Sequence, residues 1–244
     1  MRLTKLPAWI VALGWCSAPP VLAALAPELA DLAGRIDYGF YNEDARAIEA
    51  ARTTLKRLGD SPDVNYYRDF AALRLAQLEP AERARTALVS DCAGRAVAPD
   101  AKGPAAAEAW ILVAACAEVA HSGRRVEQAL ERARALDDDH PRIALVEAWT
   151  LQRELADDAA LRDAVTEKWQ EVVAGFDVWN GSPDAPQWGH AEALAALGEF
   201  ALARGEARTA RDLIERALLL APDYRFAMEL RGRIQGNGSA VRAP

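Results

Sequence analysis

Three histidines and one acidic run are the side chains of this 244-residue chain best suited to metal chemistry. Three consecutive aspartates lead into His140, and Asp137 and Asp139 could join His140 as oxygen and nitrogen ligands of a metal ion. A solvated turn between two helices accounts for the same run. The other two histidines, His121 and His190, lie in a predicted turn and at the start of a predicted helix, away from such a run.

The sequence lacks the common catalytic motifs. It has no H-E-x-x-H pair for zinc, no G-x-S-x-G elbow for a serine nucleophile and no P-loop for nucleotide phosphates. Its cysteines are not spaced C-x-x-C, which disfavours redox catalysis. We therefore expect a protein that is not an enzyme, that needs no cofactor and that acts by binding alone.

The composition indicates a helical protein. Hydrophobic residues make up 51% of the chain and aromatic residues only 7%, so the apolar material is mainly Ala and Leu, which favour closely packed helices. The abundance of Ala and Arg is typical of GC-rich bacterial coding. The net charge of −7 and the lack of a basic stripe argue against a nucleic-acid partner, which would need clustered Lys and Arg.

Residues 1–23 have the organisation of a secretory signal peptide. Arg2 and Lys5 supply the positive charge, residues 8–15 form a short apolar run, and Ala23 ends a small-residue cleavage site. The run is well short of the roughly 18 residues that a membrane span requires, so no span is expected. Lipidation at Cys16 is disfavoured because Trp15 precedes it. The expected location is therefore the periplasm or the exterior.

Residues 191–224 contain the clearest pattern in the chain. Gly198 and Ala210 lack bulk, so two helices can approach closely, and Ile214 can fill the groove between them. Gly205 suits the left-handed residue that ends a helix, and Pro222 cannot extend one. The spacing also includes Leu194, Leu197, Ala201 and Ala217. This unit of 34 residues resembles a tetratricopeptide repeat (TPR).

The resemblance extends over most of the C-terminal half. Residues 107–140 form a second repeat, with Gly123 expected at its turn, and residues 141–176 form a third, degenerate pair. We expect degenerate helical pairs in 24–106, where Asn42 can cap the second helix, TPR-like repeats in 107–235 with an inserted loop at 176–190, and a disordered tail at 236–244. The implied fold is all-α, a right-handed superhelix of about four antiparallel helix pairs and a terminal helix.

The resemblance also implies a binding surface. Proteins of this family bind other proteins on the inner, concave face, through fixed positions of the first helix of each repeat. Those positions here include Glu108, Ile111, Glu118, Arg142, Leu145, Trp149, Gln152, Arg153, Glu192, Glu199 and Leu202. Acidic residues are common in the turns that join such repeats, so the run before His140 predicts a turn and no metal site.

We therefore expect an exported interaction module or scaffold of the bacterial cell envelope, which binds a protein or peptide partner. One alternative is an adaptor subunit of an envelope assembly, secretion or pilus machine. A second alternative is a small-molecule binder or enzyme that uses the Trp-rich insertion, where Trp179 and Trp188 would contact the ligand. We prefer the interpretation that these two rings pack between helix pairs and hold the insertion in place.

The predicted helical array also indicates how two of the cysteines could come together. Cys92 falls near the end of one predicted helix and Cys116 midway along the next, and adjacent helices of such an array can bring them together. An even pair in an exported protein favours a disulfide. The alternative is two buried free thiols, which behave as small apolar groups.

Overall fold

The computed structural model describes residues 27–95, 97, 103–155, 162–180 and 186–240. These residues form helices joined by turns and contain no strand, which confirms the predicted all-α class. The helices are α1 (Pro27–Tyr41), α2 (Ala45–Leu55), α3 (Pro62–Leu78), α4 (Glu82–Gly94), α5 (Pro104–Val119), α6 (Gly123–Arg134), α7 (Pro141–Leu155), α8 (Arg162–Val178), α9 (His190–Ala203), α10 (Ala207–Leu220) and α11 (Arg225–Ala240).

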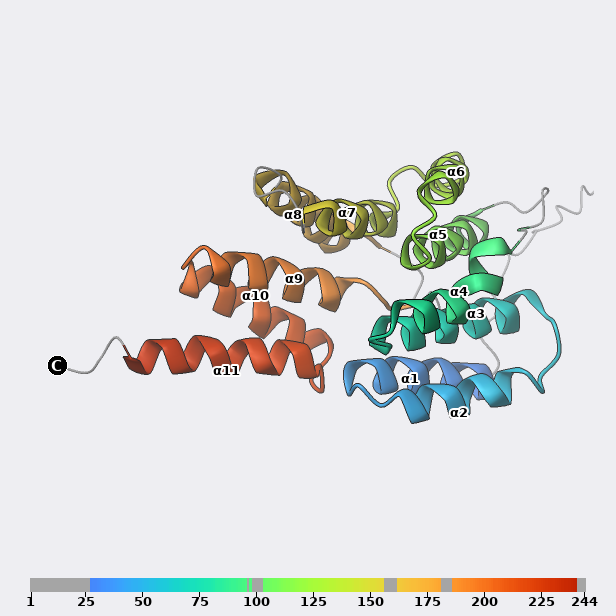
Figure 1. Ribbon diagram of the computed structural model, residues 1–244, viewed down its shortest axis with the longest axis horizontal. Coiled ribbons are helices and arrows are strands. Elements are labelled where there is room, and N and C mark those ends of the chain that lie inside the picture. The colour runs from blue at the N-terminus through green and yellow to red at the C-terminus, as the bar shows by residue number, and fades with distance from the viewer. Residues whose placement is uncertain (1–26, 96, 98–102, 156–161, 181–185, 241–244) are drawn as a thin grey trace, which may run out of the picture.

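Successive helices pack as pairs. The pairs are α1 with α2, α3 with α4, α5 with α6, α7 with α8, and α9 with α10, and α11 packs against the last pair. The described residues therefore hold five pairs and a terminal helix, one pair more than the sequence count. The odd-numbered helices α1, α3, α5 and α7 also contact one another in order, so they form an inner layer (Figure 1).

The pair α9–α10 shows why its sequence folds in this way. A Cβ atom at Gly198 would lie only 2.7 Å from the Cδ1 atom of Ile214, so glycine is what lets the two helices approach. Ala210, Ile214 and Ala217 are buried in the same contact. Gly205 follows the end of α9 with a φ of +80°, in the left-handed region that the sequence predicted for this turn.

Two local features differ from the sequence expectations. The Asp44 side chain, and not Asn42, caps α2 by accepting hydrogen bonds from the N–H groups of residues 46 and 47. In the α5–α6 turn, His121 takes the left-handed conformation with a φ of +55°, and Gly123 is the first residue of α6. Because α6 already begins at Gly123, the turn falls on residues 120–122 that precede it.

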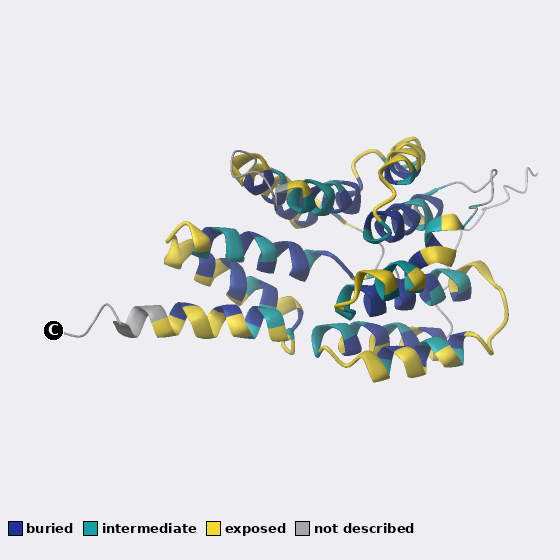
Figure 2. Ribbon diagram, viewed as in Figure 1, coloured by how far each residue is buried: buried dark blue, intermediate teal, exposed yellow. Residues whose placement is uncertain are grey.

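The inner helices are buried on more sides than their partners. Helices α3, α5 and α9 are mostly buried in Figure 2, whereas α2, α6 and α11 expose much of their surface. All seven residues from 111 to 117 in α5 are buried. Such a helix can be apolar all round because neighbours cover it on every side. Helices α3, α5 and α9 therefore lie in the core of the molecule.

The last helix returns to the first. The ring centroids of Tyr41, at the end of α1, and Tyr224, just before α11, are 4.9 Å apart in an edge-to-face contact. Arg225 at the start of α11 lies 3.8 Å from the Glu43 carboxylate. Figure 1 shows α11 and α1 meeting end to end, so the array curls until its two ends touch.

The helix ends in the structure can be compared with several predicted segment boundaries. Helix α8 continues to Val178 and α9 begins at His190, so the insertion between helices is shorter than 176–190, and 181–185 lie outside the described residues. Helix α11 continues to Ala240, into the segment 236–244 that was predicted to be disordered. The predicted signal peptide lies outside the described residues. No helix in the described part has the length and apolarity needed to cross a bilayer.

The two cysteines lie together. The sulfur atoms of Cys92 on α4 and Cys116 on α5 are at disulfide-bonding distance, and both side chains are buried. The pairing joins consecutive helix pairs, as the helical array predicted. It encloses a segment that contains residues 96 and 98–102, which lie outside the described residues.

Candidate functional site: a groove above a buried charge network

A groove of about 670 Å³ runs along the inner layer of helices. Its walls come from the C-terminal parts of α1, α3, α5 and α7 and from α9, with single residues from α4 and α8 and two residues just before and within α11. Lining side chains include Phe40, Gln77, Arg85, Glu118, Trp149, Gln152, Arg153, Trp169, Glu192, Glu199, Tyr224 and Phe226. We call this hollow the groove.

The groove contains part of the surface that the sequence predicted. Six of the eleven predicted concave-face residues line it, namely Glu118, Trp149, Gln152, Arg153, Glu192 and Glu199. Leu202 is half-buried outside the lining. Ile111 and Leu145 have no exposed surface, because neighbouring inner helices cover them, and Glu108 and Arg142 are also buried. These last four residues do not line the groove.

The first half of the buried network pairs α3 with α9. Arg74 has no exposed surface, and its guanidinium donates to the Glu192 carboxylate. Glu192 also accepts from the Tyr41 hydroxyl at 3.0 Å and the Gly189 N–H at 2.9 Å. Burial alone would raise the pKa of Glu192, but the Arg74 charge and these hydrogen bonds outweigh burial and lower it. The pair is therefore ionised and joins helices far apart in the sequence.

The second half pairs α5 with α7. The Arg142 guanidinium donates to the Glu108 carboxylate and to the carbonyl oxygens of residues 186 and 188. Glu108 also receives a hydrogen bond from the Tyr66 hydroxyl and contacts His140 Nε2 at 3.1 Å. Burial opposes ionisation of Glu108, yet the Arg142 charge and its hydrogen-bond donors lower its pKa. The network thus contains two matched arginine–glutamate pairs.

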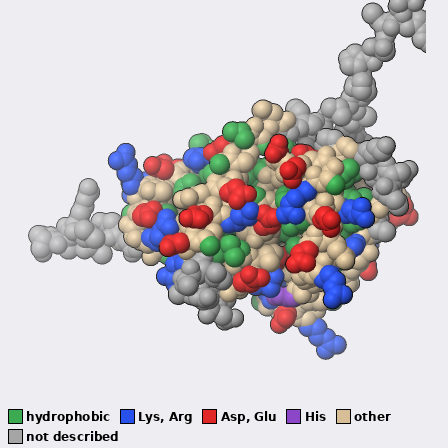
Figure 3. Space-filling view, turned by 90° about the horizontal axis from the view of Figure 1, so that it is seen from above, with side chains coloured by type: hydrophobic (Ala, Val, Ile, Leu, Met, Phe, Trp, Pro, Cys, Tyr) green, Lys and Arg blue, Asp and Glu red, His purple; other side chains and the backbone are tan. Residues whose placement is uncertain are grey.

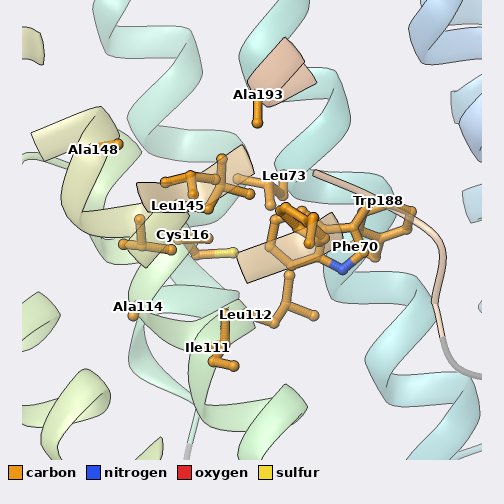
Figure 4. Packing of buried hydrophobic residues seen from close by; sticks show 14 of the residues in the cluster. Phe70, Leu73, Ile111, Leu112, Ala114, Cys116, Leu145, Ala148, Trp188 and Ala193 are labelled. Carbon is orange, nitrogen blue, oxygen red and sulfur yellow. The ribbon is translucent and has the colours of Figure 1, made fainter. Parts of the chain in front are cut away.

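Trp188 joins the two halves. Its indole has no exposed surface, and its N–H donates to the Tyr66 hydroxyl at 3.0 Å. The guanidinium carbons of Arg74 and Arg142 lie 5.7 Å and 5.0 Å from the ring centroid, within cation–π range. Figure 4 shows the indole beside Phe70 in the apolar core. Trp188 therefore anchors the segment before α9 to the inner layer.

Trp179 is less deeply buried and covers the other side of Arg142. Its ring centroid is 4.8 Å from the guanidinium carbon and 5.1 Å from the His140 ring. His140 itself contacts Glu108 through Nε2 and accepts from the N–H of residue 142 through Nδ1. Both imidazole nitrogens are thus used inside the network, and the histidine does not face the aspartate run. Among the described residues, no cluster of metal-ligating side chains occurs.

Sequence reasoning missed half of this network. Arg74 and Tyr66 lie in α3, in the part of the chain where the repeat pattern is poor, so no family position singled them out. A charged residue within the apolar run of residues 70–76 was the available signal. Its partner, Glu192, is 118 residues away, and no local periodicity could have paired them.

The lining of the groove combines charged, amide and aromatic side chains. Glu118 pairs with Arg153 at 2.8 Å, and Glu199 lies 3.7 Å from Arg233. Arg85 forms no ion pair within the described residues. The lining also contains aromatic rings and the side-chain amides of Gln77 and Gln152. Such a lining can hold an extended segment through ring contacts and amide hydrogen bonds.

The sequence was compared with known proteins. No protein-family model matches the chain, and no curated protein matches it significantly.

Proposed function

We propose that the protein is an exported TPR-like interaction module of the bacterial cell envelope. Its helix pairs would form a right-handed superhelix, and the groove would bind an extended segment of a protein or peptide partner. Binding is its whole activity in this proposal, with no catalysis and no cofactor. The observation that carries the proposal is the groove, to which the inner helices α1, α3, α5, α7 and α9 all contribute.

The chemistry of the groove supports a peptide ligand. Phe40, Trp149 and Phe226 are half-buried and offer ring surfaces, and aromatic side chains often provide most of the energy of an interface. Gln77 and Gln152 use their side-chain oxygens inside the protein, which leaves their amide N–H groups for a ligand carbonyl. An extended peptide presents carbonyl groups and side chains at regular intervals, and this lining suits both.

Rigid walls also support the proposal. Glu192 of the buried network lines the groove, and the lining rings of Trp149 and Phe40 pack on Trp188 and Arg74 of that network. A preorganised surface loses little entropy when a ligand binds, so a modest groove can bind well. On the face shown in Figure 3, acidic and basic side chains are interspersed. Shape and ring contacts, more than long-range charge, would then select the partner.

The proposed compartment is supported by two independent features. The N-terminal sequence has the charge, apolar run and cleavage site of a secretory signal, and Cys92 and Cys116 lie at disulfide-bonding distance. Disulfides persist in oxidising compartments such as the periplasm.

Peptide selection on the purified exported protein tests the proposal. A displayed library of random 12-residue peptides is selected against it, and the affinity of selected peptides is measured by fluorescence anisotropy. The double variant Arg85→Glu/Phe226→Ala changes two groove side chains of α4 and α11 and should weaken binding about tenfold or more. Arg132→Glu, a charge reversal on the exposed face of α6, is the control and should bind as the wild type does. Equal affinity of the groove variant and the wild type would remove the proposal.

A further inference from the structure

A second hollow of about 420 Å³ lies on another side of the buried network. It is enclosed by α1, the start of α7, the ends of α8 and α10, and the residues that lead into α9. None of its lining residues lines the groove. The inference drawn for this hollow therefore does not depend on the proposed use of the groove.

The hollow contains a carboxylate without a matched cation. Asp37 of α1 lines it, and its Oδ1 atom is buried and accepts no hydrogen bond from the described residues. The buried network holds two guanidinium groups, and each already pairs with a glutamate. Asp37 is the third carboxylate near these two arginines, so the ionised network has one negative charge in excess.

The other charged groups around the hollow do not supply the missing positive charge. Arg142 lines the wall, but it is paired with Glu108 as described. Asp223 at the edge is exposed and adds negative charge. His190 contacts Asp177, and burial lowers the pKa of its imidazole, so it is neutral at pH 7. Burial likewise raises the pKa of Asp37 to about 6, against the opposing charge of Arg74.

Exposed apolar side chains surround the opening. Tyr38 and Leu220 belong to the lining and are 56% and 54% exposed. Val178 and Leu219, which are next to lining residues in the chain, are 76% and 82% exposed. Two of the five large hydrophobic side chains that are exposed in the described part of the chain therefore line this hollow. A cluster of this kind marks a surface that a ligand covers.

We propose that this hollow binds an ammonium group carried on an apolar stem. The ammonium would enter beside Asp37 and form the ion pair that the carboxylate lacks, with the rings of Tyr41 and Trp179 as further cation-binding surfaces. The apolar stem would lie across the rim of Tyr38 and Leu220. Two sources carry this chemistry, a free amine and a lysine side chain of a peptide.

The charge requirement is tested first with the free-amine source. The probes are 4-phenylbutylamine, its neutral analogue 4-phenylbutanol and its acidic analogue 4-phenylbutyric acid, each titrated at pH 7.5 against the purified protein by isothermal calorimetry. The amine should bind saturably and at least tenfold more tightly than either analogue. Equal binding of the alcohol or the acid would overturn the proposal.

The lysine source is tested in parallel with the peptide acetyl-Leu-Lys-Leu-amide and its norleucine analogue, which lacks the ammonium group. Tighter binding of the lysine peptide than of 4-phenylbutylamine assigns the hollow to peptides, and the reverse assigns it to free amines. Failure of both ammonium probes to bind at 10 mM would overturn the proposal.

Variants of residues that line the hollow test whether the amine binds there. Asp37→Asn keeps the shape of the side chain but removes its charge and should weaken the amine at least tenfold. Asp31→Asn changes an exposed aspartate of the same helix and should have no effect. Tyr38→Ser at the exposed rim gives a second test that leaves the buried network intact, and it should weaken the amine severalfold. Binding that is unchanged in both Asp37→Asn and Tyr38→Ser would contradict the assignment.

Discussion

In the described part of the chain, buried charged side chains are paired with opposite charges, and Asp37 is the exception. Arg74 and Arg142 each have a glutamate partner and an aromatic neighbour, and Trp188 lies between them. Asp37 has neither a hydrogen bond to Oδ1 nor a cation of its own. We therefore expect opposite effects on stability when a paired glutamate is removed and when the unpaired Asp37 carboxylate is neutralised.

Removal of a paired charge should destabilise the protein strongly. Glu192→Ala leaves the Arg74 guanidinium buried without its counter-ion, which typically costs about 3–5 kcal/mol of unfolding free energy. Glu199→Ala, on the same helix but partly exposed, should cost less than about 1 kcal/mol. Urea unfolding followed by circular dichroism measures both. Similar losses for the two variants would contradict the assigned role of the buried pair.

Removal of the unpaired charge should instead stabilise the protein at neutral pH. A carboxyl whose pKa is higher in the folded state binds its proton more tightly there, so stability is lost as the pH rises from 3.8 through about 6. Asp37→Asn avoids this loss and should be more stable than the wild type by about 1–3 kcal/mol at pH 8.

The pH dependence separates this effect from a general change in packing. The difference between Asp37→Asn and the wild type should shrink below pH 6 and vanish near pH 3.5, where the aspartate is protonated in both states. Thermal unfolding of both proteins at a series of pH values measures this difference in stability. A difference that does not vary with pH would show that the charge is not its cause. If Asp37→Asn is more stable than the wild type but binds amines less tightly, then the wild-type aspartate lowers stability while it supports ligand binding.

At the scale of the helices, close approach of α9 and α10 depends on one small residue. In Gly198→Ala the new Cβ atom would lie 2.7 Å from Ile214 Cδ1, and overpacking of this kind costs about 1–3 kcal/mol. Ile214→Val removes that Cδ1 atom. Gly198→Ala should therefore lower the free energy of unfolding less in the Ile214→Val background than in the wild type. Chemical denaturation of the single and double variants measures this coupling.

A matched control separates overpacking from helix propensity. Gly232 lies on an exposed part of α11 with open space where a Cβ would be added, so Gly232→Ala should raise stability by up to about 1 kcal/mol. If the effects of Gly198→Ala and Ile214→Val on the free energy of unfolding are strictly additive, the contact between these two positions is contradicted.

The link between α4 and α5 makes a separate prediction. A disulfide between Cys92 and Cys116, which are 24 residues apart, should stabilise the protein by about 3 kcal/mol on the loop-entropy argument. Reductant should lower the midpoint of unfolding of the wild type and leave the variant Cys92→Ser/Cys116→Ser unchanged. Mass spectrometry that finds both cysteines alkylated in the unfolded, unreduced protein would refute the bridge.

Local pattern predicted the helices well and their long-range contacts poorly. The spacing around Gly198 and Gly205 identified the α9–α10 pair, because both residues serve contacts within one helical hairpin. Helix ends shifted by a few residues where a second candidate stood nearby, as with Asp44 and Asn42. The Arg74–Glu192 pair could not be predicted, because it forms only when the array curls and brings α3 beside the start of α9.

At the scale of the whole molecule, the curled array has two separate hollows. Contacts of Tyr224 with α1 close the array, and the buried network fills its centre. The groove and the second hollow lie on different sides of that centre and share no lining residue. Our account therefore predicts that ligands of one hollow leave the affinity of the other nearly unchanged.

The most direct test of the central claim is to locate a bound peptide on the molecule. A peptide from the selection described above, with a photoreactive benzophenone residue at each position in turn, is cross-linked to the protein, and the modified residues are identified by mass spectrometry. Our account predicts cross-links to groove residues such as Arg85, Gln152 and Phe226. Cross-links confined to the exposed faces of α2 and α6 would contradict it.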